Sequence, residues 1–409
     1  MNLQVEPRFN DLCLIKEKLR NSMPVVVIKS HGHLGLGIAR SLGRVGASIY
    51  AIGSDRRDPS LNSRYQKRKF IWDSDDKTFE ETVEQLLRIG RSIGERSLLI
   101  PTTDEISLLL AEHADELQEW FVFHKLQTQL IRTLISKKDL YFLAVKNGIP
   151  APRIFLPDSR ETVKKYLKDL TFPVMLKGID SFTAIRRTGH KMFIAQTKDE
   201  LLRLYDHYEN ISNPIFMLQE YIPSNGGSWI FNGYFNDKSE CLFSATGKKI
   251  RDVPIHIGAT SFGVCLNNEL IRDLSLHFMK DIGYKGIVDI DFAFDSRDRK
   301  YKILDVNPRL GSTFRMFTAT NGLDVVRAEY FDLTNQFIPK SSVTEGRKWL
   351  VEDWDLITSL KRYVTGSLTL KKWLKSYCGV QETAWFAIDD LLPFFLMFKS
   401  VIQTTIRHR

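Results

Sequence analysis

The sequence predicts an α/β fold with a parallel-sheet domain first, a larger mixed domain next and a helical region last. Three observations support this prediction. The apolar segment Pro24 to Ile28 runs into a glycine-rich turn and a helix, as in βαβ units with a buried parallel sheet. Residues 286–313 alternate between polar and apolar like two paired strands. From about residue 340 the chain indicates helices and is rich in tryptophan. The predicted domain ranges are 1–125, 126–335 and 336–409.

Composition limits the class of protein. The chain has 409 residues, 43% of them hydrophobic and 26% charged, which is typical of a soluble globular protein with two or three domains. The net charge of +9 suits anionic ligands. We find no motif that reads RNA or DNA, so we favour a small anion and expect no nucleic-acid partner. The four cysteines lack metal or disulfide spacing, and no apolar run reaches the roughly 18 residues of a spanning helix. We therefore expect a cytoplasmic protein.

The N-terminal domain follows the βαβ pattern after a polar, helical lead-in at 1–22. Glycines follow the first strand with the spacing GxxGxG, and a helix is expected over 38–45. A glycine-rich turn at a helix start can bind anions, but this spacing is not GxGxxG, so we favour tight strand–helix packing. We interpret residues 54–69 as a basic loop. We interpret Asp104 and Glu105 as the start of a helix rather than as substrate ligands, because acids suit that end of the helix dipole.

The predicted strand pair holds the best candidate metal site. Asp289 and Asp291 share one face of the first strand, and Asp305 and Asn307 share one face of the second. A hairpin can bring these faces together, and oxygen ligands of this kind suit Mg²⁺. Arg309 follows on the same face, where it could meet an anion. The alternative is an ordinary hairpin with a solvated acidic face.

Four separated motifs then occur in one order. They are the helix of Lys138 with its GIPAP ending, PVMLKG at 173–178, MLQEYIP at 217–223, and DFAFD…ILDVNPRLGS at 291–312. Together they resemble the ATP-grasp superfamily of carboxylate–amine ligases. The last motif resembles the superfamily's magnesium strand pair, and its register of 14 positions favours Asp291 over Asp289. Upstream, GHLGLGIARSLGRVGASIYAI and the SRY at 63–65 are similar to the first domain of D-aspartate-ligase-like members.

The resemblance implies an architecture. It implies a Rossmann-like pre-ATP-grasp domain over 1–125 and a two-lobed ATP-grasp domain over 126–335. The small lid lobe of the second domain is expected at about 150–222. A helical C-terminal extension completes the expected fold.

The resemblance also implies roles for individual residues. Lys138 and Lys177 are expected to neutralise the phosphates of ATP. The interdomain hinge is expected to read the adenine edge through Gln219, Glu220, Tyr221 and Ile222. The expected ligands of Mg²⁺, or of Mn²⁺, are Asp291, Asp305 and Asn307. Arg309 is expected to support substrate or acylphosphate charge.

Two positions depart from the superfamily's pattern. The acid that often holds the ribose is absent after the hinge, where Gly226, Gly227 and Ser228 stand. Asp305 replaces the commoner glutamate.

The implied chemistry activates a carboxylate with ATP as an acylphosphate and lets an amine, such as that of an amino acid, attack it. Such catalysis depends on positioning and on cationic side chains. Arg309 or Arg251 could stabilise the oxyanion of the tetrahedral adduct. We include Lys248 among the catalytic candidates, although Lys248 and Arg251 could equally be solvated surface charges.

Other functions stay open. The alternatives are a carboxylase or small-molecule kinase on the same scaffold, or a regulatory protein without turnover. The expected partners are a small carboxylate and an amine, and a homodimer is not excluded. The apolar segment Phe386–Phe398 could contact a membrane surface. We favour a helix packed on the core, because Asp389 and Asp390 interrupt the segment and Pro393 breaks it.

Overall fold

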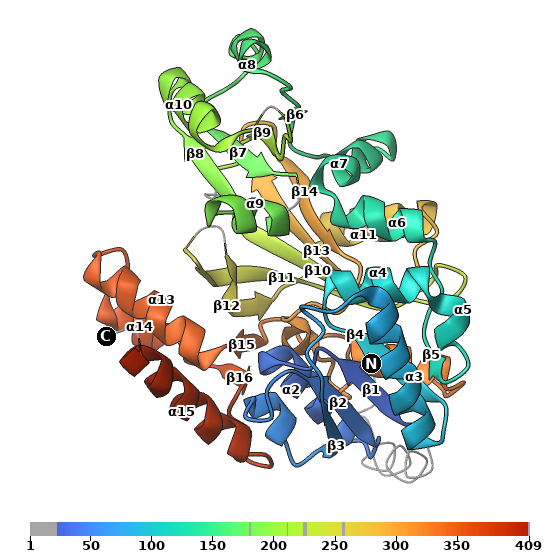
Figure 1. The fold of residues 1–409 in the computed structure, drawn as a ribbon. Helices are drawn as coiled ribbons and strands as arrows, with labels where there is room; N and C mark the ends of the chain where they lie inside the picture. Colours follow the sequence, from blue (N-terminus) through green and yellow to red (C-terminus); the bar gives the residue numbers. More distant parts are fainter. Residues whose placement is uncertain (1–22, 180, 211, 224–226, 256–257, 408–409) are drawn as a thin grey trace, which may run out of the picture. The chain divides into compact units, whose positions relative to one another are not determined.

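The computed structural model describes residues 23–179, 181–210, 212–223, 227–255 and 258–407 (Figure 1). The lead-in predicted at 1–22 lies outside these residues. The chain divides into two compact units. Unit 1 comprises Met1–Thr128, Ile230–Asp289 and Pro308–Arg409, and unit 2 comprises Gln129–Trp229 and Ile290–Asn307. The division into three domains stays a prediction.

Unit 1 contains the parallel sheet that the sequence predicts. Its strands pair in parallel throughout. In spatial order they are β3 (Gln66–Ile71), β2 (Ile49–Gly53), β1 (Val25–Ile28), β4 (Ser97–Pro101) and β5 (Phe121–Val122). The helices of this part are α2 (Gly32–Gly43), η1 (Pro59–Asn62), α3 (Phe79–Ile93), α4 (Asp104–Glu112) and α5 (Ala114–Leu117).

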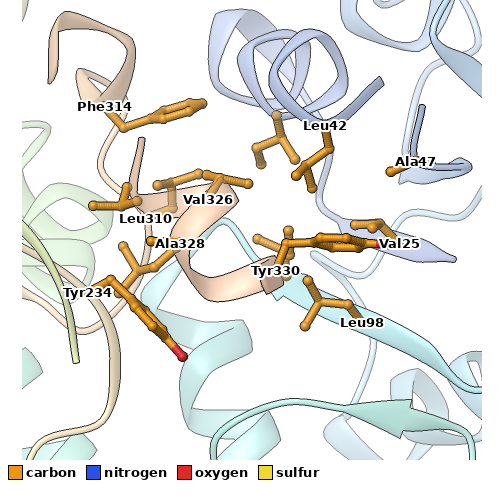
Figure 2. Packing of buried hydrophobic residues seen from close by; sticks show 14 of the residues in the cluster. Val25, Leu42, Ala47, Leu98, Tyr234, Leu310, Phe314, Val326, Ala328 and Tyr330 are labelled. Carbon is orange, nitrogen blue, oxygen red and sulfur yellow. The ribbon is translucent and has the colours of Figure 1, made fainter. Parts of the chain in front are cut away.

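The apolar side chains of β1 alternate between two cores because the sheet is covered on both faces. Val25 and Val27 pack on one face with α2 and with α12 (Val325–Leu333), and Figure 2 shows part of this cluster. Val26 and Ile28 pack on the other face with α3 and α4. All four side chains are at most 1% exposed, which explains why β1 contains no polar residue.

The glycine-rich segment is helical, not a turn. Helix α2 begins at Gly32, so Gly35 and Gly37 lie inside it, and the helix predicted over 38–45 starts six residues too late. A Cβ atom at Gly35 would lie 2.4 Å from Ser30 Oγ, and one at Gly37 would lie 2.9 Å from the Phe314 ring. These close approaches agree with the predicted packing role of the glycines.

The basic loop predicted over 54–69 is corrected by the structure. It contains the 3₁₀ helix η1 and most of β3, whose sequence QKRKFI pairs with β2 at the edge of the parallel sheet. Edge strands often carry charged side chains, because charge discourages pairing with another chain. The lysines and arginine of β3 therefore concealed its strand pattern.

Unit 2 is built on an antiparallel sheet. Its strands, in spatial order, are β6 (Ile154–Phe155), β9 (Phe216–Glu220), β7 (Val174–Gly178) and β8 (Met192–Ala195). Its helices are α6 (Thr128–Ile135), α7 (Lys137–Lys146), α8 (Arg160–Tyr166), α9 (Ser181–Thr188) and α10 (Lys198–Tyr208). The basic segment at 186–191 begins as the last turn of α9. This helix buries Ala184 and ends before Gly189, whose φ of 76° suits a helix end.

The third sheet contains the predicted strand pair at one edge. Its strands, in spatial order, are β14 (Lys300–Asn307), β13 (Gly286–Asp295), β10 (Ser228–Phe235), β11 (Cys241–Val253), β12 (Ala259–Cys265), β15 (Lys348–Leu350) and β16 (Val380–Thr383). The boundaries of the two units fall within β10 and β13. Unit 1 also contains α11 (Glu269–Asp281) and the 3₁₀ helix η3 (Phe314–Phe317).

The C-terminal region contains the predicted helical structure and, in addition, strands β15 and β16. Its helices are α13 (Glu352–Val364), α14 (Leu370–Ser376) and α15 (Leu392–Arg407). The prediction that Pro393 breaks the segment is wrong. Pro393 lies in the first turn of α15, where its missing N–H group costs nothing. No helix among the described residues is both long enough and apolar enough to cross a membrane.

Asp389 and Asp390, which interrupt the apolar segment in the sequence, anchor the C-terminal region in the structure. Arg44 donates two hydrogen bonds of 2.9 Å to Asp389, and Arg40 donates one of 3.1 Å to Asp390. The hydroxyl groups of Ser63 and Tyr65 also donate to these two carboxylates. The SRY motif thus binds the Asp-Asp pair.

Candidate functional site

The candidate nucleotide site of unit 2 is organised around a buried lysine. Lys177 lies at the end of β7 and is 8% exposed. Its Nζ donates to the hydroxyl group of Tyr141 over 3.4 Å. That hydroxyl group also lies 3.2 Å from Gln219 Oε1 and 3.0 Å from the Leu304 carbonyl oxygen. The cluster joins α7, β7, β9 and β14.

The electrostatics of Lys177 are unusual. Burial lowers the pKa of its ammonium group to about 7, and the positive charge of Lys137 adds to the effect. Burial also raises the pKa of the Tyr141 hydroxyl group, so Tyr141 stays neutral. A lysine that is hard to charge in the free protein gains most when an anion arrives. Such groups mark candidate functional sites.

Lys137 is a residue that the sequence analysis missed. It begins α7 directly after the N-cap Ser136, and its Nζ forms an ion pair with Asp305 Oδ1. The prediction chose Lys138, which is partly exposed one position further along the helix. A phosphate role for Lys138 stays a prediction, whereas Lys137 contacts a predicted metal ligand.

Helical periodicity explains which lysine faces the cluster. Leu140, Tyr141 and Ala144 are the buried residues of α7, and Lys137 shares their face by the i, i+3, i+4, i+7 rule. This signal was obscured because Phe142 and Val145 on the other face are also apolar, although they are 55% and 63% exposed. An all-apolar pattern does not reveal which face is buried.

The predicted metal ligands lie on neighbouring strands. Asp291 is on β13, and Asp305 and Asn307 end β14, which lies beside β13 in the sheet. All three are partly exposed, whereas Ile290 and Val306 are buried. Two carboxylates and one amide oxygen on partly exposed positions fit Mg²⁺, which binds hard oxygen donors and usually keeps water or phosphate ligands. The donor set therefore suits the predicted metal.

Asp289, the alternative first ligand, has a different environment in unit 1. It is 7% exposed, and a Cβ atom at Gly311 would lie 1.3 Å from its Oδ2. The carboxylate thus occupies the space that any side chain at position 311 would need. This burial agrees with the preference for Asp291 as the ligand.

The hinge motif ends strand β9. Gln219 is 2% exposed, and β9 pairs with β7 on one side and with β6 on the other. Tyr221 and Ile222 follow the strand and are partly exposed. Adenine reading by this backbone stays a prediction.

The Glu220 side chain belongs to a charge cluster within unit 2. Arg297 donates to Glu220 over 2.7 Å and to Asp295 over 2.6 Å. Lys302 donates to the same two carboxylates over 3.0 Å and 2.8 Å. Hydrogen bonds from Arg297, followed by those from Lys302, hold the pKa of Asp295 well below its usual range. The cluster fixes the end of β9 to the turn between β13 and β14.

The three predicted catalytic cations lie in unit 1. Arg309 Nε donates to Asp104 Oδ1 over 2.8 Å. Asp104 begins α4 after the N-cap Thr103, so its predicted helix-start role is confirmed. Lys248 lies on β11 opposite Val264 of β12 and is partly exposed.

Arg251 makes structural contacts. Its guanidinium is buried and donates to both carboxylate oxygens of Asp355, over 2.7 Å and 2.8 Å. It also donates to Ser376 and lies 4.5 Å from the centre of the Phe262 ring. These contacts fasten α13 to the sheet, and an oxyanion role for Arg251 stays a prediction.

Comparison with known proteins supports a nucleotide site. The family "Carbamoyl-phosphate synthase L chain, ATP binding domain" matches residues 265–330. A D-aspartate ligase of Enterococcus faecium is 27% identical over 304 residues, which are 71% of this chain and 72% of that protein.

Solved structures share the fold. One is the biotin carboxylase domain of 2-oxoglutarate carboxylase from Hydrogenobacter thermophilus, in complex with MgADP and bicarbonate (TM-score 0.60, 15% identity, 80% of this chain and 74% of that chain). Another is N5-carboxyaminoimidazole synthetase from Staphylococcus aureus (TM-score 0.62, 11% identity, 80% of this chain and 82% of that chain). Similarity at these identities establishes the fold alone, and it confirms the fold class predicted from the sequence.

Proposed function

Because this chain belongs to the ATP-grasp superfamily, we propose that it is an ATP-dependent carboxylate–amine ligase. It activates a carboxylate as an acylphosphate and couples it to an amine, with release of ADP and phosphate. The observation that carries the proposal is the convergence of Lys177 and Lys137 near Asp305 within unit 2. Two cations from different elements beside a carboxylate suit a nucleotide phosphate together with a metal ion.

The lysines act by position and charge. In phosphoryl transfer, catalysis comes mostly from alignment and from cations that offset the charge of the phosphoryl oxygens. Lys177 is held by Tyr141 on a buried strand end, so its ammonium group enters the site with little loss of side-chain entropy. Lys137 forms an ion pair with Asp305. When Asp305 binds a metal ion instead, the Lys137 ammonium group can bind a phosphate group. Lys138 is a further candidate on the same helix end.

Asp291, Asp305 and Asn307 would hold Mg²⁺ or Mn²⁺. When bound there, the metal would offset the negative charge of the phosphates. The shorter Asp305 in place of glutamate still offers a carboxylate at the end of β14. Arg309 would support the charge of the carboxylate substrate, and Arg251 or Lys248 would do so only with a rearrangement of their contacts.

The substrate class follows from the relatives by analogy. The name of the enterococcal relative makes aspartate the first carboxylate to test. A carboxylase is the second candidate, because two solved structures of the same fold are named as biotin carboxylase domains, and both are bound to bicarbonate. Bicarbonate activation would begin with the same phosphoryl transfer, so both candidates use the same lysines and metal ligands.

An ADP-release assay tests the proposal. The purified chain is incubated with Mg-ATP and pools of carboxylates and amines, with bicarbonate as a separate pool. We expect ADP release that requires both a carboxylate and an amine. Hydroxylamine should trap the acylphosphate as a hydroxamate, which distinguishes a ligase from a small-molecule kinase.

Two controls sharpen the assay. Lys177→Met should lower ADP release by at least about 100-fold, whereas Lys146→Met, an exposed lysine of α7, should not change it. ADP release that needs only bicarbonate and an amine would favour the carboxylase. Nucleotide binding without ADP release in any pool would contradict both enzymes and favour a regulatory role.

A further inference from the structure

The C-terminal region of unit 1 exposes an unusual amount of apolar surface. Of the twenty large apolar side chains that are exposed among the described residues, thirteen lie between positions 356 and 398. We call them the C-terminal apolar face. They are Leu356, Ile357, Leu360, Tyr363, Val364, Leu370, Leu374, Phe386, Ile388, Leu391, Leu392, Phe395 and Phe398. Concentrated apolar exposure of this kind marks an interaction site.

Helix α13 is amphipathic, but most of its apolar residues are exposed and its buried residues are polar. Leu356, Leu360 and Val364 follow one another at intervals of four and are 52%, 52% and 77% exposed. The buried positions are instead polar, with Asp355 and Ser359 fully enclosed. The buried side of α13 is thus held to the rest of unit 1 by hydrogen bonds and an ion pair, and its apolar side is exposed.

Helix α15 presents a second apolar stripe. Leu392 and Phe395 are 54% and 62% exposed, whereas Met397 packs in the core cluster that contains Trp349 and Trp385. The sequence predicts that this segment packs on the core. The structure shows that it packs by one face only, and that α13, α14 and α15 are close neighbours at one end of the chain (Figure 1).

The acidic residues of this region point inward. Glu352 accepts hydrogen bonds from the backbone N–H groups of Trp385 and Phe386, and Asp353 accepts one from Trp385 Nε1. Asp355 binds Arg251. Asp389 binds Arg44, and Asp390, which binds Arg40, is buried.

The exposed charges of the region are all positive. Within residues 356–400, all of which the structure describes, no aspartate or glutamate is exposed. The exposed charged residues there are Lys361, Lys371, Lys372, Lys375 and Lys399. The face therefore combines exposed apolar side chains with lysines and has no exposed acidic residue. It is complementary to a partner with a negatively charged surface and an apolar interior.

We propose that the C-terminal apolar face docks the protein on an anionic lipid bilayer. Leucine and phenylalanine side chains enter the interface while the lysines meet lipid headgroups. Lysine is well suited to this, because its long stem stays apolar while its ammonium group reaches the headgroups. A second copy of the chain is a poorer occupant, because self-association would bring like charges together. The proposal is independent of the ligase activity.

Vesicle flotation with the full chain tests the proposal. We expect the protein to float with vesicles in which about one third of the lipid is phosphatidylglycerol, and to stay behind with pure phosphatidylcholine. Flotation should fall steeply as salt is raised from about 0.1 M to about 1 M. Equal recovery with both kinds of vesicle, or none with either, would overturn the proposal.

Matched variants localise the effect. The triple variant K371Q, K372Q, K375Q should lower partitioning by about 100-fold, since each lysine near an anionic surface contributes about fivefold. The pair Leu374→Gln and Phe395→Gln should also abolish flotation. The control pair Leu270→Gln and Phe337→Gln removes exposed apolar groups elsewhere on unit 1 and should float normally.

Two further measurements keep the result unambiguous. Circular dichroism and ADP release in solution should be unchanged in all variants, because none of the replaced side chains is buried. Light scattering without lipid should give the same molecular mass for the unchanged chain and for the variant that carries Leu374→Gln and Phe395→Gln. A lipid-free dimer that this pair dissociates would assign the face to self-association and refute membrane docking.

Discussion

Lys177 should take up a proton when nucleotide binds. In the free protein, burial and the neighbouring charge of Lys137 bring its pKa to about 7. A bound phosphate supplies the opposite charge that the buried ammonium group lacks, so the pKa rises towards its ordinary value of 10.5. Binding therefore changes the protonation of this one side chain between about pH 7 and pH 10.

The size of the effect follows from the free-state pKa. At pH 8 the free lysine carries about 0.1 proton, so complete protonation on binding takes up about 0.9 proton per nucleotide. At pH 7 the uptake is about 0.5 proton, and at pH 6 it is about 0.1. Because the bound state has the higher pKa, affinity is greatest below pH 7 and falls about tenfold per pH unit above it.

Isothermal titration calorimetry measures this uptake directly. Mg-ADP is titrated at pH 8 in buffers with different ionisation enthalpies, and the slope of the heat against that enthalpy gives the number of protons. Lys177→Met should remove the uptake, and Lys146→Met should keep it. A slope that is the same in Lys177→Met and in the unchanged chain would refute the assignment of the proton to Lys177.

Three further substitutions probe the two units. Asp291→Ala should lower ATP turnover by at least about 100-fold while leaving the circular dichroism spectrum unchanged; normal ADP release would remove Asp291 from the metal site. Asp295→Asn should lower the free energy of unfolding by about 3 kcal/mol in urea, because it leaves Lys302 and Arg297 with fewer partners. The pKa of Asp295 is depressed in the folded state, so its contribution is present above its ordinary value near 3.8 and is lost as the pH falls below it. Burial, with help from Asp332, raises the pKa of Glu329 to about 8, so stability should fall by about 3 kcal/mol between pH 5 and pH 8. Glu329→Gln should flatten that dependence in urea titrations, and an unchanged slope would show that Glu329 is charged.

Local sequence patterns predicted those strands and helices in which buried positions are apolar and exposed positions are polar. The sequence of β1 is apolar throughout because both faces of its sheet are covered, and β13 alternates between polar and apolar residues. Strand β3 was missed for the opposite reason. It lies at a sheet edge, where a row of lysines is compatible with strand pairing.

For the candidate site, the sequence indicates motifs but not contacts. The order of the motifs indicated Lys177 and Asp305, yet the sequence does not show that Tyr141 lies between Lys177 and Gln219. Lys137 and Lys138 are adjacent in sequence, and only the burial of one face of α7 distinguishes them. Arg251 pairs with a residue 104 positions away, and no spacing rule reveals such a partner.

The C-terminal strands have a consequence for how the chain can be shortened. β15 pairs with β12, and Trp349 and Trp385 share a core cluster with Leu36 of α2. A chain ending near residue 340 would leave β12 without its partner strand β15 on one edge and would deprive Arg40 of its carbonyl and carboxylate acceptors. The last seventy residues are therefore an integral part of the core of unit 1. Proteolytic loss of this segment should cause precipitation of unit 1, and evolutionary exchange of the segment for another would have to preserve a strand, two tryptophans and the Asp-Asp pair.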